Sequence, residues 1–114
     1  MNEKIWGCRV TRTGPAATIA LSGEIEMSVS GEVLRLITAE LRRPGITTVR
    51  VDLSAVSFLG SAGMQSLVEA RKLAADRGQR LVVIGANGLP LHVLDVTGLL
   101  AFLDGTDSEG RPGT

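Results

Sequence analysis

The sequence predicts a single α/β domain built on a mixed β-sheet, and three observations indicate this class. After Leu53, apolar segments of strand length alternate with segments of helical periodicity. A Gly-Pro turn separates the first two apolar segments, which indicates an antiparallel hairpin. The chain has 114 residues, the usual length of one domain. Because strand–helix–strand units cross over in a right-handed sense, we expect the later strands to be mostly parallel and covered by helices.

The N-terminal hairpin is predicted to consist of two strands, Trp6–Arg12 and Ala17–Ser22. Thr13-Gly14-Pro15 forms the turn between them. The second strand alternates small polar with apolar side chains, as a half-buried strand does. We expect Cys8, in the first strand, to be a small buried hydrophobic residue.

A first long helix follows, with Ser28 as its expected N-cap. Pro44-Gly45 ends it. Its buried side is predicted from apolar residues at helical spacing, namely Val29, Val33, Leu36, Ile37 and Leu41.

The middle of the chain predicts a strand at Thr47–Leu53, a loop at Ser54–Gly60 and a helix at Ser61–Arg77. Within the loop, we expect Phe58 to point into the core. The buried stripe of the helix is predicted to be Gly63, Leu67, Ala70 and Ala74, and its polar stripe Ser61, Gln65, Glu69, Lys72 and Asp76. Gly78 is expected to end this helix.

The continuous apolar segment Leu81–Gly85 predicts a central strand that is covered on both faces. A helix capped by Asn87 is expected from Gly88 to Val96, and a last short strand from Leu99 to Leu103. Residues 1–103 would form the domain, and residues 104–114, rich in Gly, Asp and Ser, a flexible tail.

Composition excludes several classes of function. The formal net charge is zero, with 12 basic and 12 acidic residues, and aromatic residues make up only 3% of the chain. Nucleic-acid binding needs basic surfaces or stacked aromatic rings, so we expect no nucleic-acid partner. One Cys and one His provide neither a disulfide nor a zinc cluster. With no apolar segment of about 18 residues, we expect no membrane insertion and a cytoplasmic location.

Ser61 is the clearest candidate for a chemically functional residue, and its position leaves two interpretations open. It can be a plain N-cap of the helix that it opens. It can also be an exposed phosphoacceptor, because a helix N-terminus stabilises a phosphate group and small neighbours leave the hydroxyl accessible.

Enzymatic activity is not expected, nor is a cofactor. The sequence around Ser61, LGSAG, lacks the first glycine of the G-x-S-x-G elbow of hydrolases, and His92 lies on an apolar helical segment. No phosphate-binding glycine loop occurs. Glu24 and Glu26 form a carboxylate pair of the kind that is usually solvated.

Three stretches together resemble the STAS domain of the bacterial anti-sigma factor antagonists. Residues 21–26, LSGEIE, are similar to the L-x-G-E-[IL]-D motif of that family, and residues 51–64, VDLSAVSFLGSAGM, to its [VIL]-D-[LF]-x-x-[VL]-x-F-[ML]-D-S-[ST]-G-[LM] motif. Residues 94–99, LDVTGL, match a weaker motif, [LF]-x-x-[ST]-G-L. The chain has Glu26 and Gly60 where the family has aspartates. The resemblance implies a mixed sheet with helices mainly on one face and the N-terminal strand at an edge.

The resemblance also implies a function in partner switching. In that family the antagonist binds an anti-sigma factor that is also a serine kinase, and a sigma factor is released. The kinase phosphorylates a serine, which corresponds to Ser61, and a serine phosphatase restores the active form. The implied partner-binding residues are Glu24, Glu26, Ser57, Leu59, Gly60, Ser61, Ala62, Gly63 and Met64. An alternative within the same resemblance is a cytosolic STAS subunit of a lipid-transport ABC complex.

Overall fold

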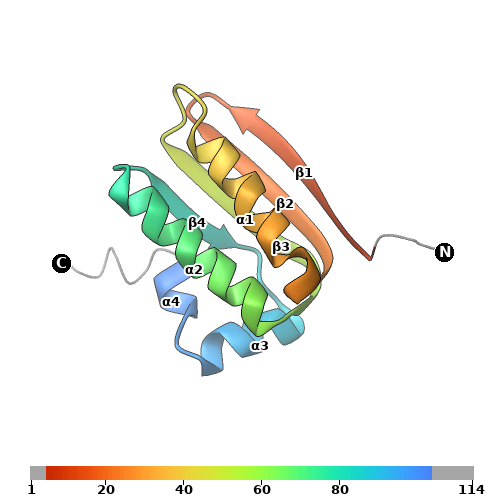
Figure 1. The fold of residues 1–114 in the computed structure, drawn as a ribbon. Helices are drawn as coiled ribbons and strands as arrows, with labels where there is room; N and C mark the ends of the chain where they lie inside the picture. Colours follow the sequence, from red (N-terminus) through yellow and green to blue (C-terminus); the bar gives the residue numbers. More distant parts are fainter. Residues whose placement is uncertain (1–4, 104–114) are drawn as a thin grey trace.

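The computed structural model describes residues 5–103, so the predicted tail at residues 104–114 lies outside the described residues. The α/β class is confirmed (Figure 1). The elements follow in the order β1 (Trp6–Thr13), β2 (Ala16–Ile25), α1 (Met27–Leu41), β3 (Thr48–Leu59), α2 (Ser61–Asp76), β4 (Arg80–Ile84), α3 (Gly88–Val96) and α4 (Leu100–Leu103). Within residues 5–103, no helix is long and apolar enough to cross a lipid bilayer.

The four strands form one sheet in the order β1-β2-β3-β4. β1 pairs antiparallel with β2, which confirms the hairpin, while β2, β3 and β4 pair in parallel. Because the parallel strands advance in one direction across the sheet, right-handed crossovers place α1 and α2 on the same face. Figure 1 shows these two helices covering that face, and β1 lies at an edge as predicted.

The core lies between the sheet and the two long helices. Alternate residues of the parallel strands face it and are buried, namely Ala17, Ile19, Leu21, Val49, Val51, Leu53, Leu81 and Val83. The predicted buried stripe of α2 is confirmed, since Gly63, Leu67, Ala70 and Ala74 are all buried. Small residues on this stripe let the helix approach the sheet closely.

The predicted C-terminal arrangement is wrong in two linked respects. β4 is an edge strand and not a central one, although Leu81, Val82 and Val83 are buried. The segment from Leu99 to Leu103 forms no strand beside it; Leu100–Leu103 is the helical turn α4. Arg71 holds this turn, because its Nε donates to the carbonyl oxygen of Phe102 at 2.8 Å and its guanidinium lies 4.8 Å from the centre of the Phe102 ring.

The predicted loop at Ser54–Gly60 is also wrong, because β3 continues to Leu59. Two register shifts between β2 and β3 break the strict alternation of buried and exposed side chains, and this hides the strand in the sequence. Phe58 is 41% exposed and not in the core. Cys8, expected to be buried, is exposed on the edge strand.

The predicted helix caps differ in detail from the structure. α1 begins at Met27 with Glu26 as its N-cap, and α2 begins at Ser61 with Gly60 as its N-cap, so neither Ser28 nor Ser61 is a cap. Asn87 does occupy the N-cap position of α3, but its side chain makes no cap bond; its Nδ2 donates to the carbonyl oxygens of Ser54 and Gly85.

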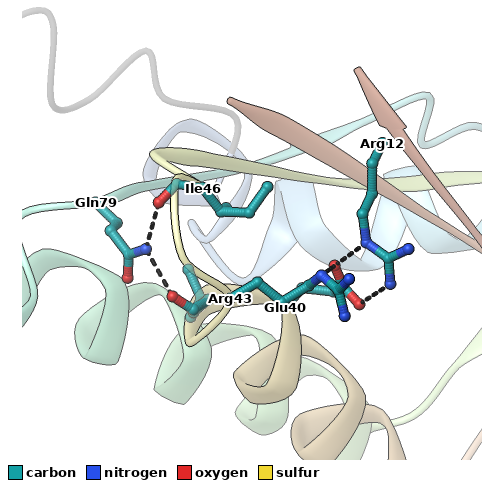
Figure 2. A network of polar contacts seen from close by, with 6 residues as sticks. Arg12, Glu40, Arg43, Ile46 and Gln79 are labelled. Atoms are coloured by element: carbon teal, nitrogen blue, oxygen red, sulfur yellow. Dashed lines mark hydrogen bonds and ion pairs between the residues drawn. The ribbon is translucent and has the colours of Figure 1, made fainter. Parts of the chain in front are cut away.

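A buried carboxylate connects the edge strand to the helical layer (Figure 2). Glu40 of α1 is 6% exposed and accepts hydrogen bonds from Nε and Nη2 of Arg12 of β1, at 3.0 and 2.8 Å. These bonds hold the pKa of Glu40 below its ordinary value of 4.5, against the opposing effect of burial. In the same view, Nε2 of Gln79 donates to the carbonyl oxygens of Leu41 and Ile46, both at 2.7 Å, and so fixes the end of α1.

Gly63 sets how closely α2 approaches the sheet. A Cβ atom at this position would lie 3.0 Å from Cγ2 and from the carbonyl oxygen of Ile25, and 3.0 Å from Cδ1 of Leu59. Contacts of this length are tighter than almost any real Cβ contact, so the helix start touches the ends of β2 and β3 directly.

We expect Arg12→Ala to lower stability at neutral pH, because it removes both hydrogen bonds from Arg12 to the buried Glu40 carboxylate and leaves only the longer ion pair with Arg43, at 3.8 Å. Since the pKa of Glu40 is depressed in the folded state, the contribution of the pair is present above pH 4.5 and is lost as pH falls through the lowered pKa. Urea denaturation of wild type and variant should therefore show a difference that shrinks in acid. Arg9→Ala, which removes an exposed arginine of the same strand, is the matched control and should show no such pH dependence.

We expect Gly63→Leu to destabilise the fold by about 1–3 kcal/mol through overpacking against Ile25 and Leu59. Gly31→Ala is the control, because Gly31 is also helical and a Cβ added there would meet no atom within 4 Å, so its substitution should stabilise by about 0.5–1 kcal/mol. Thermal unfolding measures both. Equal melting temperatures for the two variants would contradict the close approach of α2.

Candidate functional site

Two segments that are far apart in the sequence meet at the carboxyl ends of β2 and β3. The parallel register pairs Glu24 with Phe58 and Ile25 with Leu59. The backbone N–H of Gly60 then donates to the carbonyl oxygen of Ile25 at 2.9 Å. The starts of α1 and α2 therefore lie beside each other at this end of the sheet (Figure 1).

Ser61 is the first residue of α2 and is exposed. Gly60 before it is extended, and the first helical hydrogen bond runs from the Met64 N–H to the Gly60 carbonyl oxygen at 3.0 Å. The Ser61 side chain makes no cap bond to the helix. Ser61 belongs to the first turn of α2, whose N–H groups have no acceptors within the helix and favour a negative charge.

The structure brings all nine sequence-predicted partner-binding residues to this one end of the molecule, but not all of them to the surface. Leu59 is only 2% exposed, and Gly63 is buried as well. These two buried residues belong to the core beneath the site and not to its surface. The others are exposed or half-buried, namely Glu24, Glu26, Ser57, Gly60, Ser61, Ala62 and Met64.

Three exposed apolar residues at the same end were not among the predicted site residues. Met27, the first residue of α1, is 79% exposed, and Ile5 is 54% exposed. The carbonyl oxygen of Ile5 accepts the backbone N–H of Glu24 at 2.9 Å, which places Ile5 beside the site. The ring of Phe58 lies against Gly60. Because Ser28 was expected to be the N-cap, Met27 was not identified as the first residue of the helix. No sequence pattern singles out Ile5.

The site combines these apolar side chains with negative charge. Among the residues that the structure describes, neither Glu24 nor Glu26 takes part in an ion pair. His92, the only histidine, is exposed on α3. No group of three His, Cys, Asp or Glu side chains within residues 5–103 could hold a metal ion. The arrangement offers an accessible hydroxyl beside exposed apolar and acidic side chains.

Comparison with known proteins identifies the family. A family model described as "Mlab, STAS domain" matches residues 8–104. The anti-sigma-B factor antagonist of Listeria monocytogenes is 28% identical over 93 residues, which are 82% of this chain and 81% of that protein.

Solved structures show the same fold. An anti-sigma factor antagonist from Mycobacterium paratuberculosis has a TM-score of 0.73 at 24% identity, covering 82% of this chain and 79% of that one. The phosphorylated form of the Bacillus cell fate determinant SpoIIAA has a TM-score of 0.66 at 17% identity, covering 82% and 85%. A murine anion transporter, Slc26a9, contains the fold in 14% of its chain, with a TM-score of 0.66 at 12% identity over 75% of this chain.

The family model spans most of the chain, and the overall fold agrees with these structures. The chain therefore belongs to the STAS domain family, with anti-sigma factor antagonists among its relatives.

Proposed function

We propose that this chain is a non-enzymatic regulator that binds an anti-sigma factor with serine kinase activity and thereby releases a sigma factor. The observation that carries the proposal is the exposed Ser61 hydroxyl at the first position of α2, within a surface of apolar and acidic side chains. Its antagonist relative in Listeria and the phosphorylated form of SpoIIAA support it.

Phosphorylation of Ser61 would switch this surface off. A phosphate group adds roughly −1.5 to −2 charges at neutral pH. In the free protein, the N–H groups at the start of α2 stabilise that charge. In the complex, the phosphate would have to be desolvated next to Glu24 and Glu26. The difference between the two states favours dissociation, and a serine phosphatase would reverse it.

A second candidate is a cytosolic STAS subunit of a lipid-transport ABC complex. The description of the matching family model, Mlab, and the occurrence of the fold within an anion transporter support it. In that role the Ser61 surface would bind a transporter subunit without needing a phosphate switch. Co-purification from the native cell separates the two, since one predicts a kinase-like partner and the other an ATPase with a permease.

Intact mass of the protein purified from its native cell, with and without phosphatase treatment, is the direct test of modification. We expect a fraction of the chain to carry one phosphate that phosphatase removes, and Ser61→Ala to lack it. Unmodified wild type under every growth condition would favour the transporter role.

We expect Ser61→Ala to fold and bind the anti-sigma factor like wild type. Because the Ser61 side chain makes no cap bond, the change should alter the free energy of unfolding by less than the ~1 kcal/mol that a lost N-cap costs. Ser61→Glu should also fold but bind weakly, since it places a charge where the phosphate would be. Calorimetry measures both affinities.

Thr11→Glu is a matched control, because it adds the same charge at an exposed position of β1 that pairs with Thr18, toward the end of the sheet opposite to the Ser61 site. A local switch at Ser61 predicts that Thr11→Glu binds like wild type. If Ser61→Glu also bound like wild type, the switch at Ser61 would be refuted.

We expect the isolated protein to bind nucleotide weakly, above ~1 mM, and to hydrolyse none. The start of α2 offers a few N–H donors, and Gly60 supplies no carboxylate for a magnesium ion. Titration of ATP or GTP with Mg²⁺, followed by amide chemical shifts, measures this. Micromolar binding at Ser61, or turnover that Ser61→Ala abolishes, would contradict a passive substrate role.

A further inference from the structure

The outer surface of the helical layer carries a groove between α1 and α2, separate from the Ser61 site. A hollow of 390 Å³ is lined by Gly31, Leu34, Arg35, Thr38, Ala39 and Arg42, all from α1 or its C-cap. A second hollow of 290 Å³ is lined by Leu34 and Thr38 together with Glu69, Lys72, Leu73 and Asp76 of α2. Because both hollows share Leu34 and Thr38, they form one continuous groove.

The floor of this groove suits close packing of another helix. Leu34 and Leu73 are half-buried, and small residues beside them on α1 would let a backbone approach. The Thr38 hydroxyl donates to the carbonyl oxygen of Leu34 at 2.8 Å, so it needs no partner from outside. A helix that fills the groove therefore does not have to bury a polar side chain in order to satisfy Thr38.

The two walls of the groove carry opposite charge at matched positions. Arg35 and Arg42 are exposed and lie seven residues apart, and so do Glu69 and Asp76 of α2. Within residues 5–103, none of the four takes part in an ion pair. Lys72 lies between the two acids and reduces the negative charge of that wall.

The two helices run parallel and nearly in register. Ser66 Oγ donates to the Ser30 carbonyl oxygen at 2.9 Å, and Arg77 Nη2 to that of Leu41 at 3.4 Å. A residue of α1 is thus level with the α2 residue 36 positions later. Arg35 and Glu69, like Arg42 and Asp76, are 34 positions apart, so each pair lies within about 3 Å of the same level along the axis.

We propose that this face binds a second copy of the same chain. In a dimer whose two-fold axis runs parallel to the helices, α1 of each copy lies over α2 of the other copy. Rotation about this axis leaves every residue at the same height along it. Arg35 then meets the partner copy's acid at position 69, and Arg42 meets the acid at position 76, on both sides of the axis. The four charges that form no ion pair within residues 5–103 of one chain thereby find partners in the other.

Such a dimer goes beyond the proposed switch but affects it. The axis runs along the helices, so the Ser61 sites of both copies point toward the same end. A partner that is itself two-fold symmetric would then be bound through two sites at once, which raises its apparent affinity without any new contact.

Sedimentation equilibrium of the full chain tests the proposal. We expect wild type to form a dimer that about 1 M salt weakens, because the salt screens the exposed charges. Arg35→Glu with Arg42→Glu should be monomeric, and so should Glu69→Lys with Asp76→Lys. Mixing these two double variants should restore a dimer, because each wall then meets its opposite charge.

Two further variants distinguish a loss of dimerisation from a loss of folding. Lys72→Glu should tighten the dimer, since it removes the like charge opposite Arg35. Arg9→Glu with Arg50→Glu makes the same charge change on exposed residues of two sheet strands and should leave the dimer intact. Wild type that stays monomeric up to about 1 mM, or double variants that fail to pair when mixed, would overturn the proposal and leave the Ser61 switch untouched.

Discussion

The close approach of α2 to the ends of β2 and β3 is the constraint on which the rest of the structure depends. It needs the absence of a side chain at Gly63, because Ile25 and Leu59 occupy the space that a Cβ would take. The same contact region holds the hydrogen bond from Gly60 to Ile25, which fixes the backbone immediately before the helix. Ser61 therefore lies at the end of a strand and the start of a helix and not in a loop, which suits the proposed role of a residue that is modified and then bound by a partner.

This constraint separates the support of the site from its surface. Leu59 and Gly63 are buried and set the position of the helix, while Ser61, Glu24 and Met27 are accessible. Substitutions in the first group would act on stability, and those in the second group on binding. A family motif combines both kinds of residue in one stretch, so membership of the motif does not reveal which residues contact a partner.

The proposed partner binding and the proposed self-association use different faces of the same two helices. The starts of α1 and α2 form the Ser61 surface, whereas their outer sides form the charged groove. Because both helices start at one end of the sheet, a two-fold arrangement of the grooves brings two Ser61 surfaces to one end. The right-handed crossovers that put α1 and α2 on one face are thus a condition of both proposals.

The sequence by itself determined the α/β class, the hairpin, the two long helices and the buried stripe of α2, because hydrophobic periodicity and glycine positions are local properties. It also singled out Ser61 as an accessible residue at a helix start, although not that Gly60 is the cap. Only the tertiary structure decided that β4 lies at an edge, that Leu99–Leu103 is not a strand, and that β3 continues to Leu59. Strand order and irregular register depend on contacts between segments that are distant in the sequence. An apolar segment indicates that a strand is buried, but it does not indicate which strands lie beside it. The exposure of Phe58, Met27 and Ile5 was decided in the same way, since a side chain at the end of a sheet is covered or left open by elements far away in the sequence.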